Sequence, residues 1–297
     1  MILKTAKAIV RQIPAINALI KQRDELLNQR NELLSQRDQL LSQRDELLSD
    51  TMKELQVANQ QYADAFEHAG VPSIPPPHLQ RRVVGGYSPK FLSSANHALR
   101  DFDSALHAVG KCLSDFENIL DFGVGCGRVA RRVSELYPIK LVGADIDSEA
   151  IAWLQQNYSS RVAQFILLPH LPPSTLKESM FDLIYSISVF THLNEEMQFS
   201  WLAELKRVVK QGGYLLLTVH GENHHQRLPL DIQQTIREKG FYYNEAAGIT
   251  EGLPEFYKTA YHTKQYIERE WSRFFEIISH TPRGCENHQD LILCRRH

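Results

Sequence analysis

The chain has little cysteine and no closely spaced cysteine pair. Its 297 residues contain four cysteines, none of them in a C-x-x-C motif. A disulfide framework or a zinc knuckle needs such pairs, so the pattern indicates a reducing compartment, and we expect a cytoplasmic protein. The sequence also lacks the G-x-S-x-G, H-E-x-x-H and P-loop motifs. It therefore carries none of these signatures of a serine hydrolase, a zinc protease or a P-loop nucleotide hydrolase.

The net charge and the hydropathy do not favour a nucleic-acid partner or a membrane-spanning segment. The formal net charge is -2, without the basic excess that nucleic-acid binding requires. No stretch approaches the roughly 20 apolar residues of a membrane span. Apolar residues with interspersed lysine and arginine in 1–20 are compatible with a weak peripheral membrane contact. We expect no nucleic-acid partner and no transmembrane segment.

Glycine and proline are absent from 15 to 69, where a heptad is repeated. Residues 21–48 are four copies of one unit, KQRDELL, NQRNELL, SQRDQLL and SQRDELL. A strict seven-residue repeat predicts a long helix that supercoils with a partner, and we expect a homo-oligomer through 15–60. The two leucines of each unit are adjacent, so with the first leucine at position a of the heptad, position d is glutamine, and with the second leucine at a it is arginine. The alternative is a long single helix that arose by tandem duplication.

A proline-rich stretch interrupts this helical pattern and marks a boundary. Residues 70–80 include one glycine and four prolines, which cannot continue a helix and form a semi-rigid spacer. We predict an N-terminal helical segment over 1–69, a linker over 70–80 and a second domain over 81–297. A further helix is expected from about Ser93 to Leu113.

The second domain is organised around a glycine turn. An apolar run at 119–122 reads as a buried strand, Gly123, Gly125 and Gly127 follow, and an amphipathic stretch continues to Leu136. Strand, glycine turn and helix are typical of the nucleotide corner of a doubly wound sheet. A dinucleotide fingerprint needs a small residue three positions after its second glycine. Arg128 stands there, which disfavours a dehydrogenase.

The motif acid-x-G-x-G-x-G resembles motif I of the class I S-adenosylmethionine-dependent methyltransferases, close to types 11 and 12. The resemblance runs from about Arg81 to the C-terminus, and the repeated helix would be a coiled-coil extension. It implies an α/β, Rossmann-like fold with a mostly parallel seven-stranded sheet, and a helix before motif I that covers the cofactor pocket. It also implies methyltransferase activity and S-adenosylmethionine as the cofactor, bound by residues of the motif: Asp121, Gly123, Gly125 and Gly127.

Two more strands carry candidate cofactor ligands. A strand at 139–147 contains Asp145, which lies 20 residues after Gly125, the separation at which an acid reaches ribose hydroxyls. Ile146 lies beside it, and Asp147 or Ser148 is expected to cap the next helix. After a third strand at 162–168 the family often has Asp or Asn near the adenine. Here His170 or a backbone group would take that place.

A fourth strand begins at Phe181 and leads into the turn VFTHL, which also resembles the family. Ser188 falls near the carboxyl end of this strand, where ligands bind in open α/β sheets. A helix over 195–209 and a Gly-Gly turn lead to a fifth strand ending near His220. Segments at 275–280 and 289–294 are expected to close the sheet as an antiparallel pair.

Three histidines are candidates for a general base. The sulfonium activates the methyl group, but an alcohol acceptor must also lose its proton, which suits histidine. His192, His220 and His262 fall on the ligand edge of the sheet, and we rank His192 first. The long segment 221–262 is expected to be a substrate lid. His220, His224 and His225 have only Glu222 as a nearby carboxylate, so we expect no metal.

The sequence defines the methyl acceptor less closely than it defines the cofactor. A coil-bearing methyltransferase of this kind resembles enzymes of surface-polysaccharide or glycan assembly, which suggests a sugar hydroxyl in a small molecule or a glycan. The alternative is a non-catalytic cofactor-binding domain that serves as an oligomeric scaffold through its coil.

Overall fold

The computed structural model of the chain describes residues 14–68, 74–85, 91–158, 163–246 and 252–297. Two compact units make up the chain, one up to Ala58 and one from Asn59 onward. None of the described helices combines the length and the apolar character needed to cross a bilayer. The peripheral membrane contact expected of 1–20 falls mostly outside the described residues.

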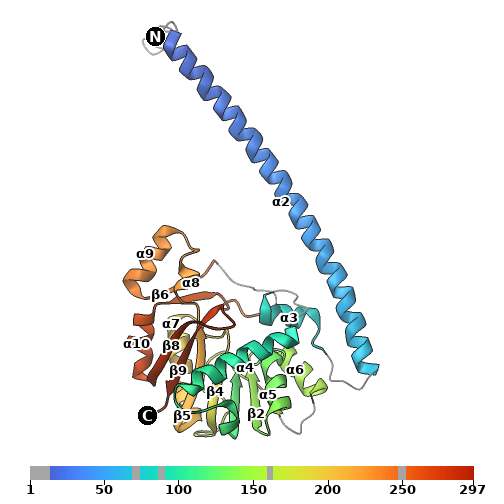
Figure 1. Cartoon of the computed structure of the whole chain (residues 1–297), viewed down its shortest axis with the longest axis vertical. Helices are drawn as coiled ribbons and strands as arrows, with labels where there is room; N and C mark the ends of the chain where they lie inside the picture. Colours follow the sequence, from blue (N-terminus) through green and yellow to red (C-terminus); the bar gives the residue numbers. More distant parts are fainter. Residues whose placement is uncertain (1–13, 69–73, 86–90, 159–162, 247–251) are drawn as a thin grey trace. The chain divides into compact units, whose positions relative to one another are not determined.

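The heptad repeat forms one continuous helix, α2 (Pro14–His68), as predicted (Figure 1). The first leucines of the repeat, Leu26, Leu33, Leu40 and Leu47, are 58–69% exposed in the single chain. Arginines of the repeat pair with the next residue along the helix, as Arg23 does with Asp24 at 2.6 Å. Such exposed ion pairs contribute at most about 1 kcal/mol each. The leucine stripe is therefore the main apolar surface of this helix.

The second unit contains the predicted seven-stranded sheet, in the order β3-β2-β1-β4-β5-β9-β8. The first five strands pair in parallel, while β9 runs antiparallel to both β5 and β8. The order reverses between β1 and β4, which is the point where doubly wound sheets bind ligands. The strands are β1 (Asn118–Phe122), β2 (Lys140–Asp145), β3 (Ala163–Leu167), β4 (Phe181–Ser186), β5 (Val209–Val219), β8 (Glu276–Cys285) and β9 (Gln289–Arg295).

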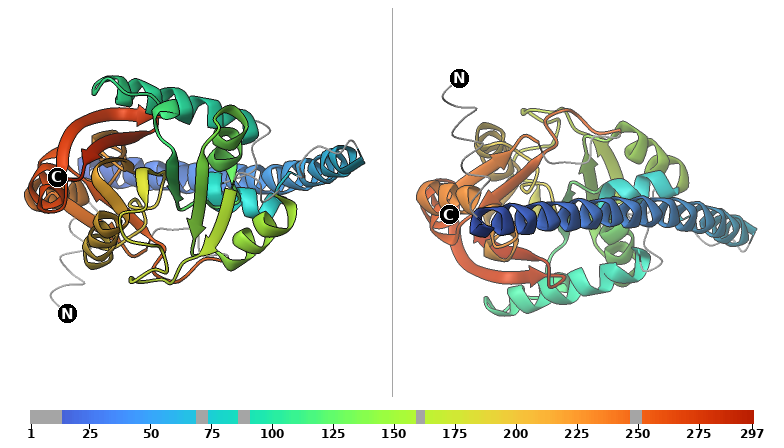
Figure 2. Two further views of the ribbon diagram at one scale, coloured as in Figure 1. Left: turned by 90° about the horizontal axis from the view of Figure 1, so that it is seen from below. Right: turned by 90° about the horizontal axis from the view of Figure 1, so that it is seen from above.

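Helices cover both faces of the sheet. One core contains side chains of α4 (Phe91–His107), α5 (Arg128–Leu136) and α6 (Ser148–Asn157), and the other contains those of α7 (Glu195–Val208) and α10 (Lys264–Glu270). Successive residues of a strand pack into opposite cores: Leu183 and Tyr185 of β4 belong to the first core and Ile184 to the second. Both views of Figure 2 show α4, in teal, along one side of the sheet.

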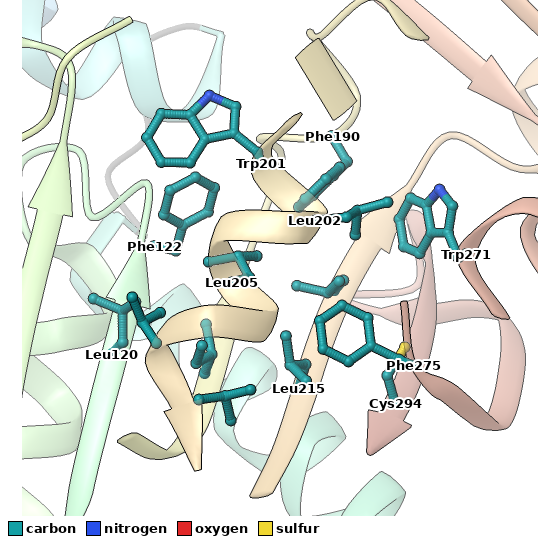
Figure 3. Close-up of a cluster of buried hydrophobic side chains, with 14 of the residues drawn as sticks. Leu120, Phe122, Phe190, Trp201, Leu202, Leu205, Leu215, Trp271, Phe275 and Cys294 are labelled. Atoms are coloured by element: carbon teal, nitrogen blue, oxygen red, sulfur yellow. The ribbon is translucent and has the colours of Figure 1, made fainter. Parts of the chain in front are cut away.

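The second core is rich in aromatic residues and fixes α7 in place. Trp201 of α7 packs against Phe122 of β1, with ring centroids 4.9 Å apart, and Phe190 packs against Trp271 at 5.1 Å. Figure 3 shows these rings beside Leu202 and Leu205 of α7. Burying each large apolar side chain stabilises the fold by about 1.5–3 kcal/mol. This layer anchors the turn between β4 and α7, which forms part of the site described below.

The structure differs from the sequence-based expectation in the linker. Helix α3 (Pro77–Val84) begins inside the predicted linker, with a proline in its first turn, where the fixed φ of proline suits a helix start. Leu79 is only 2% exposed. The second domain therefore begins before residue 81. The helix expected from Ser93 to Leu113 is also shorter, because α4 ends at His107 and a 3-10 turn, η1 (Leu113–Asp115), follows.

The segment 221–262 has secondary structure of its own. Its described residues, 221–246 and 252–262, contain two helices and a separate antiparallel two-stranded sheet. After the segment, a 3-10 turn, η2 (Trp271–Arg273), follows α10. The elements of the segment are α8 (Glu222–His225), α9 (Leu230–Lys239), β6 (Phe241–Asn244) and β7 (Thr259–His262).

Candidate active site

The glycine turn between β1 and α5 leaves no room for side chains. Gly123, Gly125 and Gly127 have φ of 84°, 53° and 84°, in the left-handed region that favours glycine. A Cβ atom on Gly125 would lie 2.5 Å from Cγ2 of Val83, and one on Gly123 would lie 2.1 Å from Cγ2 of Val189. Both the backbone conformation and the packing therefore require glycine here.

Asp145 ties this turn to the end of β2. Its Oδ2 accepts the N–H of Gly125 at 2.7 Å and its Oδ1 accepts the N–H of Asp147 at 2.9 Å. Burial raises the pKa of Asp145, and these backbone hydrogen bonds oppose the rise. Asp147 caps α6 by accepting the N–H groups of Glu149 and Ala150, as expected from the sequence.

A cavity opens at this point of the sheet, between the ends of β1, β2 and β4. It encloses about 830 Å³ of space between protein atoms, part of it open to solvent. Six of the eight residues predicted to bind the cofactor line it: Gly123, Gly125, Asp145, Ile146, His170 and Ser188.

The other two predicted ligands, Asp121 and Gly127, support the turn instead of lining the cavity. Asp121 is 4% exposed and accepts a hydrogen bond from the hydroxyl of Tyr185 at 2.8 Å. Burial raises the pKa of Asp121 to about 7, and the bond from Tyr185 opposes that rise. Gly127 precedes α5 and packs closely on Leu154.

Helix α3 covers the cavity, whereas α4 packs on the sheet. Leu79, Arg82 and Val83 of α3 all line the cavity. The guanidinium of Arg82 pairs with Asp147 at 2.9 Å and with Glu149 at 2.8 Å. The sequence analysis missed this helix, although apolar residues at 79 and 83 have helical spacing behind a proline start. From the segment 221–262, Leu253, Phe256 and Tyr257 also reach the cavity.

A second cavity adjoins the first. The two share a wall, formed by Arg82, Val83, Ile187, Ser188 and Tyr257. Beyond the shared wall most lining residues of the second cavity carry polar or charged side chains: Arg128, His192, His220, Glu286, His288 and Gln289. The site therefore has two compartments that meet at the turn after β4.

Ser188 lies in the shared wall in an unusual conformation. Its φ is 62°, a left-handed value that costs a non-glycine residue about 1–3 kcal/mol. Its N–H donates to Oγ1 of Thr218 at 2.8 Å, and its Oγ accepts a hydrogen bond from Gln289 at 2.9 Å. Strain of this kind gathers at functional sites, where surrounding contacts hold it in place.

His192 presents one nitrogen with a free lone pair. Its Nδ1 lies 2.6 Å from the carbonyl oxygen of Lys258, which only accepts, so Nδ1 carries the proton. Its Nε2 is then the acceptor, 3.5 Å from Oγ of Ser188. The ring stacks on Tyr257 with centroids 3.9 Å apart. Burial lowers the pKa of His192 to about 4, so the imidazole is neutral at neutral pH.

The other two candidate bases have different surroundings. His220 lines the second cavity and donates from Nδ1 to the carbonyl of Ala260 at 3.3 Å. Burial, followed by the neighbouring imidazoles, lowers the pKa of His220 to about 2. His262 is fully buried, is hydrogen-bonded to Gln198 at 2.9 Å and lines neither cavity. The fold thus brings two of the three histidines to the second cavity.

Comparison with known proteins found a matching family model and similar solved structures. Residues 120–217 match a family model described as a methyltransferase domain. The chain is similar to an S-adenosylmethionine-dependent methyltransferase from Methanosarcina mazei, with 22% identity over 61% of this chain and 92% of that one, at a TM-score of 0.45. It is also similar to human N-acetylserotonin methyltransferase, with 21% identity over 68% and 51% of the two chains and a TM-score of 0.47.

Proposed function

The chain carries a class I S-adenosylmethionine-dependent methyltransferase domain, and from this premise we propose that it methylates a sugar hydroxyl of a small molecule or a glycan. We assign the first cavity to S-adenosylmethionine and the second to the acceptor. The cofactor supplies an electrophilic methyl group when bound. The protein must then hold an acceptor oxygen in line with that group and exclude water.

The first cavity fits the cofactor on chemical grounds. Gly123 and Gly125 line it with backbone atoms alone, so a ligand in the cavity can approach the main chain closely. Asp145 lies at the end of β2, where an acid reaches ribose hydroxyls. Its two oxygens accept two backbone N–H groups, and a carboxylate has about four acceptor sites, so capacity remains for hydroxyls. Leu168, Trp201 and Phe256 supply an apolar wall suited to a flat ring.

The polar lining of the second cavity supports a polyhydroxylated acceptor. A sugar hydroxyl both donates and accepts, so a sugar site needs donors and acceptors together. The largely buried side chains of Arg128 and Glu286 form an ion pair in the wall of the second cavity. Gln289 also lines this cavity. Nε of Arg128 and Oε1 of Gln289 are buried without a hydrogen-bond partner among the described residues, and an apolar acceptor would leave them so, which is costly.

The single observation that carries the mechanism is the contact between Nδ1 of His192 and the carbonyl oxygen of Lys258. Nδ1 donates to this carbonyl, so Nε2 of His192, which lies 3.5 Å from Oγ of Ser188, carries the lone pair that accepts a proton at the second cavity. A pKa of about 4 makes the imidazole a weak base. A hydroxyl that is gaining a methyl group becomes strongly acidic, so a weak base suffices when it is correctly placed.

The test is the variant His192→Gln, which keeps a hydrogen bond to Lys258 but offers no basic nitrogen. We expect affinity for S-adenosylhomocysteine within about twofold of wild type, and kcat for methyl transfer to sugar acceptors lowered about 100-fold or more. His107→Gln, on the exposed end of α4, is the matched control and should match wild type. Unchanged kcat in His192→Gln would contradict the assignment. Cofactor binding with no methyl transfer to any acceptor in wild type would favour the scaffold alternative.

We also propose that α2 associates with α2 of a second copy. Its leucine stripe is exposed in the single chain, and one helix alone cannot bury such a stripe. Leu33→Glu with Leu40→Glu should lower the mass seen by light scattering at a given concentration, because these leucines are 65% exposed and contribute little to the monomer. The control is Asn28→Glu with Ser35→Glu, which places the same charges on another face of α2. Equal masses for all three proteins would contradict self-association through the stripe.

A further inference from the structure

Three histidines from separate parts of the chain meet beside the acceptor cavity. His220 follows β5, His224 lies in α8, and His288 precedes β9. Each offers a ring nitrogen, and these three nitrogens all lie within 4.8 Å of one another. The ring of His224 lies between the other two, with centroids 4.3 Å from His220 and 4.6 Å from His288. The mechanism proposed above uses none of the three.

The hydrogen bonds of the cluster leave nitrogens available as ligands. His220 donates from Nδ1 to the carbonyl of Ala260, so its Nε2 carries the lone pair. Metal-bound histidines in proteins commonly use their second nitrogen in this way, which fixes the ring and its tautomer. Both ring nitrogens of His224 are buried without a hydrogen-bond partner among the described residues. Leaving a buried polar group unpaired costs about 1–3 kcal/mol, which a bound ion would offset.

The third histidine is held by a tight turn. Glu286 and Asn287 have φ of 53° and 54°, and the N–H of His288 donates to the carbonyl of Cys285 at 3.0 Å. Two successive left-handed residues with this hydrogen bond are typical of a hairpin turn of type I′. The ion pair of Glu286 with Arg128 ties the turn to α5. His288 is exposed and so combines a fixed backbone with an accessible ring.

A carboxylate adds negative charge next to the cluster. Asp290 is 4% exposed, and its carboxylate packs directly against Gly221, between His220 and α8. It is held there by His280 at 2.8 Å and by the N–H of Arg283 at 2.9 Å. This arrangement balances part of the charge of a cation without occupying one of its coordination positions.

We propose that His220, His224 and His288 bind a transition-metal dication such as Zn²⁺, with a fourth coordination position open to the acceptor cavity. Imidazole nitrogen suits zinc and its first-row neighbours. Three protein ligands with one open position are the arrangement of catalytic zinc sites, whereas structural sites have four. His220 and His288 also line the acceptor cavity. The ion would therefore coordinate an acceptor oxygen and lower the pKa of its hydroxyl, a role that rests on the proposed function.

The test measures metal binding directly, without acceptor or cofactor. Full-length protein without a histidine tag is stripped with a chelator and titrated with Co²⁺ and Zn²⁺ by absorption spectroscopy and calorimetry. We expect one equivalent, with the intense visible absorption of four-coordinate Co²⁺. His288→Ala and His224→Ala should each weaken binding at least about 100-fold, since even residues that only orient ligands cost about 10- to 100-fold. His107→Ala, an exposed histidine of α4, is the matched control.

Equal affinity in wild type and in His288→Ala would overturn the proposal, and so would an equal loss in His107→Ala. His288 is exposed, so this variant gives a decision even where His224→Ala fails to fold. Affinity for S-adenosylhomocysteine should be the same in wild type and both cluster variants. A protein that binds the metal but methylates no sugar would contradict the proposed function and leave the metal site standing.

Discussion

Replacing Gly125 with alanine tests whether α3 closes the cofactor cavity. The added Cβ would lie 2.5 Å from Cγ2 of Val83, closer than carbon atoms approach in proteins. Either the glycine turn or α3 must then move. The turn is fixed by Asp145 and by the strands beneath it, whereas α3 has only eight residues. We therefore expect α3 to move and the cavity to open.

The expected loss of folding stability in Gly125→Ala has two contributions, which a second glycine variant separates. Alanine in the left-handed region costs about 1–2 kcal/mol, partly offset by about 0.4–1 kcal/mol because the unfolded chain loses freedom. Gly110 has φ of 67° with no atom within 4 Å of its Cβ position, so Gly110→Ala measures this part alone. Gly125→Ala adds overpacking against Val83, which costs about 1–3 kcal/mol.

The measurements are denaturant unfolding and calorimetry with S-adenosylhomocysteine. We expect Gly125→Ala to destabilise the fold more than Gly110→Ala and to weaken the ligand about tenfold or more, since 1.4 kcal/mol is tenfold in affinity. Val83→Ala removes the opposing methyl groups, so in the Gly125→Ala background it should restore part of both losses. Equal losses of stability in Gly125→Ala and Gly110→Ala would refute the argument. The same effect of Val83→Ala in the wild-type protein and in Gly125→Ala would refute it as well.

Two further predictions concern acidic residues of the site. Asp145→Asn keeps one acceptor oxygen for the two N–H groups of Gly125 and Asp147, so S-adenosylhomocysteine should bind about 1.5–3 kcal/mol more weakly by calorimetry; unchanged affinity would place the ribose elsewhere. The pKa of Asp121 is raised from 3.8 to about 7 by burial, so the folded state holds a proton that the unfolded state releases. Its contribution to stability is complete below pH 3.8 and is lost as pH rises to about 7, at roughly 1.4 kcal/mol per pH unit. Denaturant unfolding across this range should show that loss in wild type and not in Asp121→Asn.

The sheet could be predicted because its strands are buried on both faces. Such strands appear in the sequence as continuous apolar runs. Gly123, Gly125 and Gly127 mark the end of one of them, where the turn after β1 has left-handed backbone conformations. Helix α3 was missed for the opposite reason. Its start lies in a run of prolines that reads as a linker, yet a proline in the first helical turn is favourable. Only Leu79 and Val83, four residues apart, indicated a buried face.

The histidines show where sequence reasoning ends. His220 follows β5 of the seven-stranded sheet and His262 ends β7 of the two-stranded sheet, and nothing in the sequence separates their roles. The ring of His262 lies in the core because Gln198 of α7 supplies a buried hydrogen-bond partner. His288 was not considered, because its approach to His220 depends on the turn between β8 and β9. Such contacts between distant segments follow from the fold and not from local pattern.

The two cavities are built by different parts of the chain, and this separates their chemistry. The first is formed by the ends of β1, β2 and β4 with α3 over them, and its glycine turn and Asp145 interact through backbone groups. The second depends on the end of β5 and on the turn before β9. Ser188 belongs to both, and it is held by Thr218 of β5 and Gln289 of β9. Changes in the turn at 286–289 therefore act on the acceptor side first, and reach the cofactor side through the shared wall, where Gln289 directly holds Ser188.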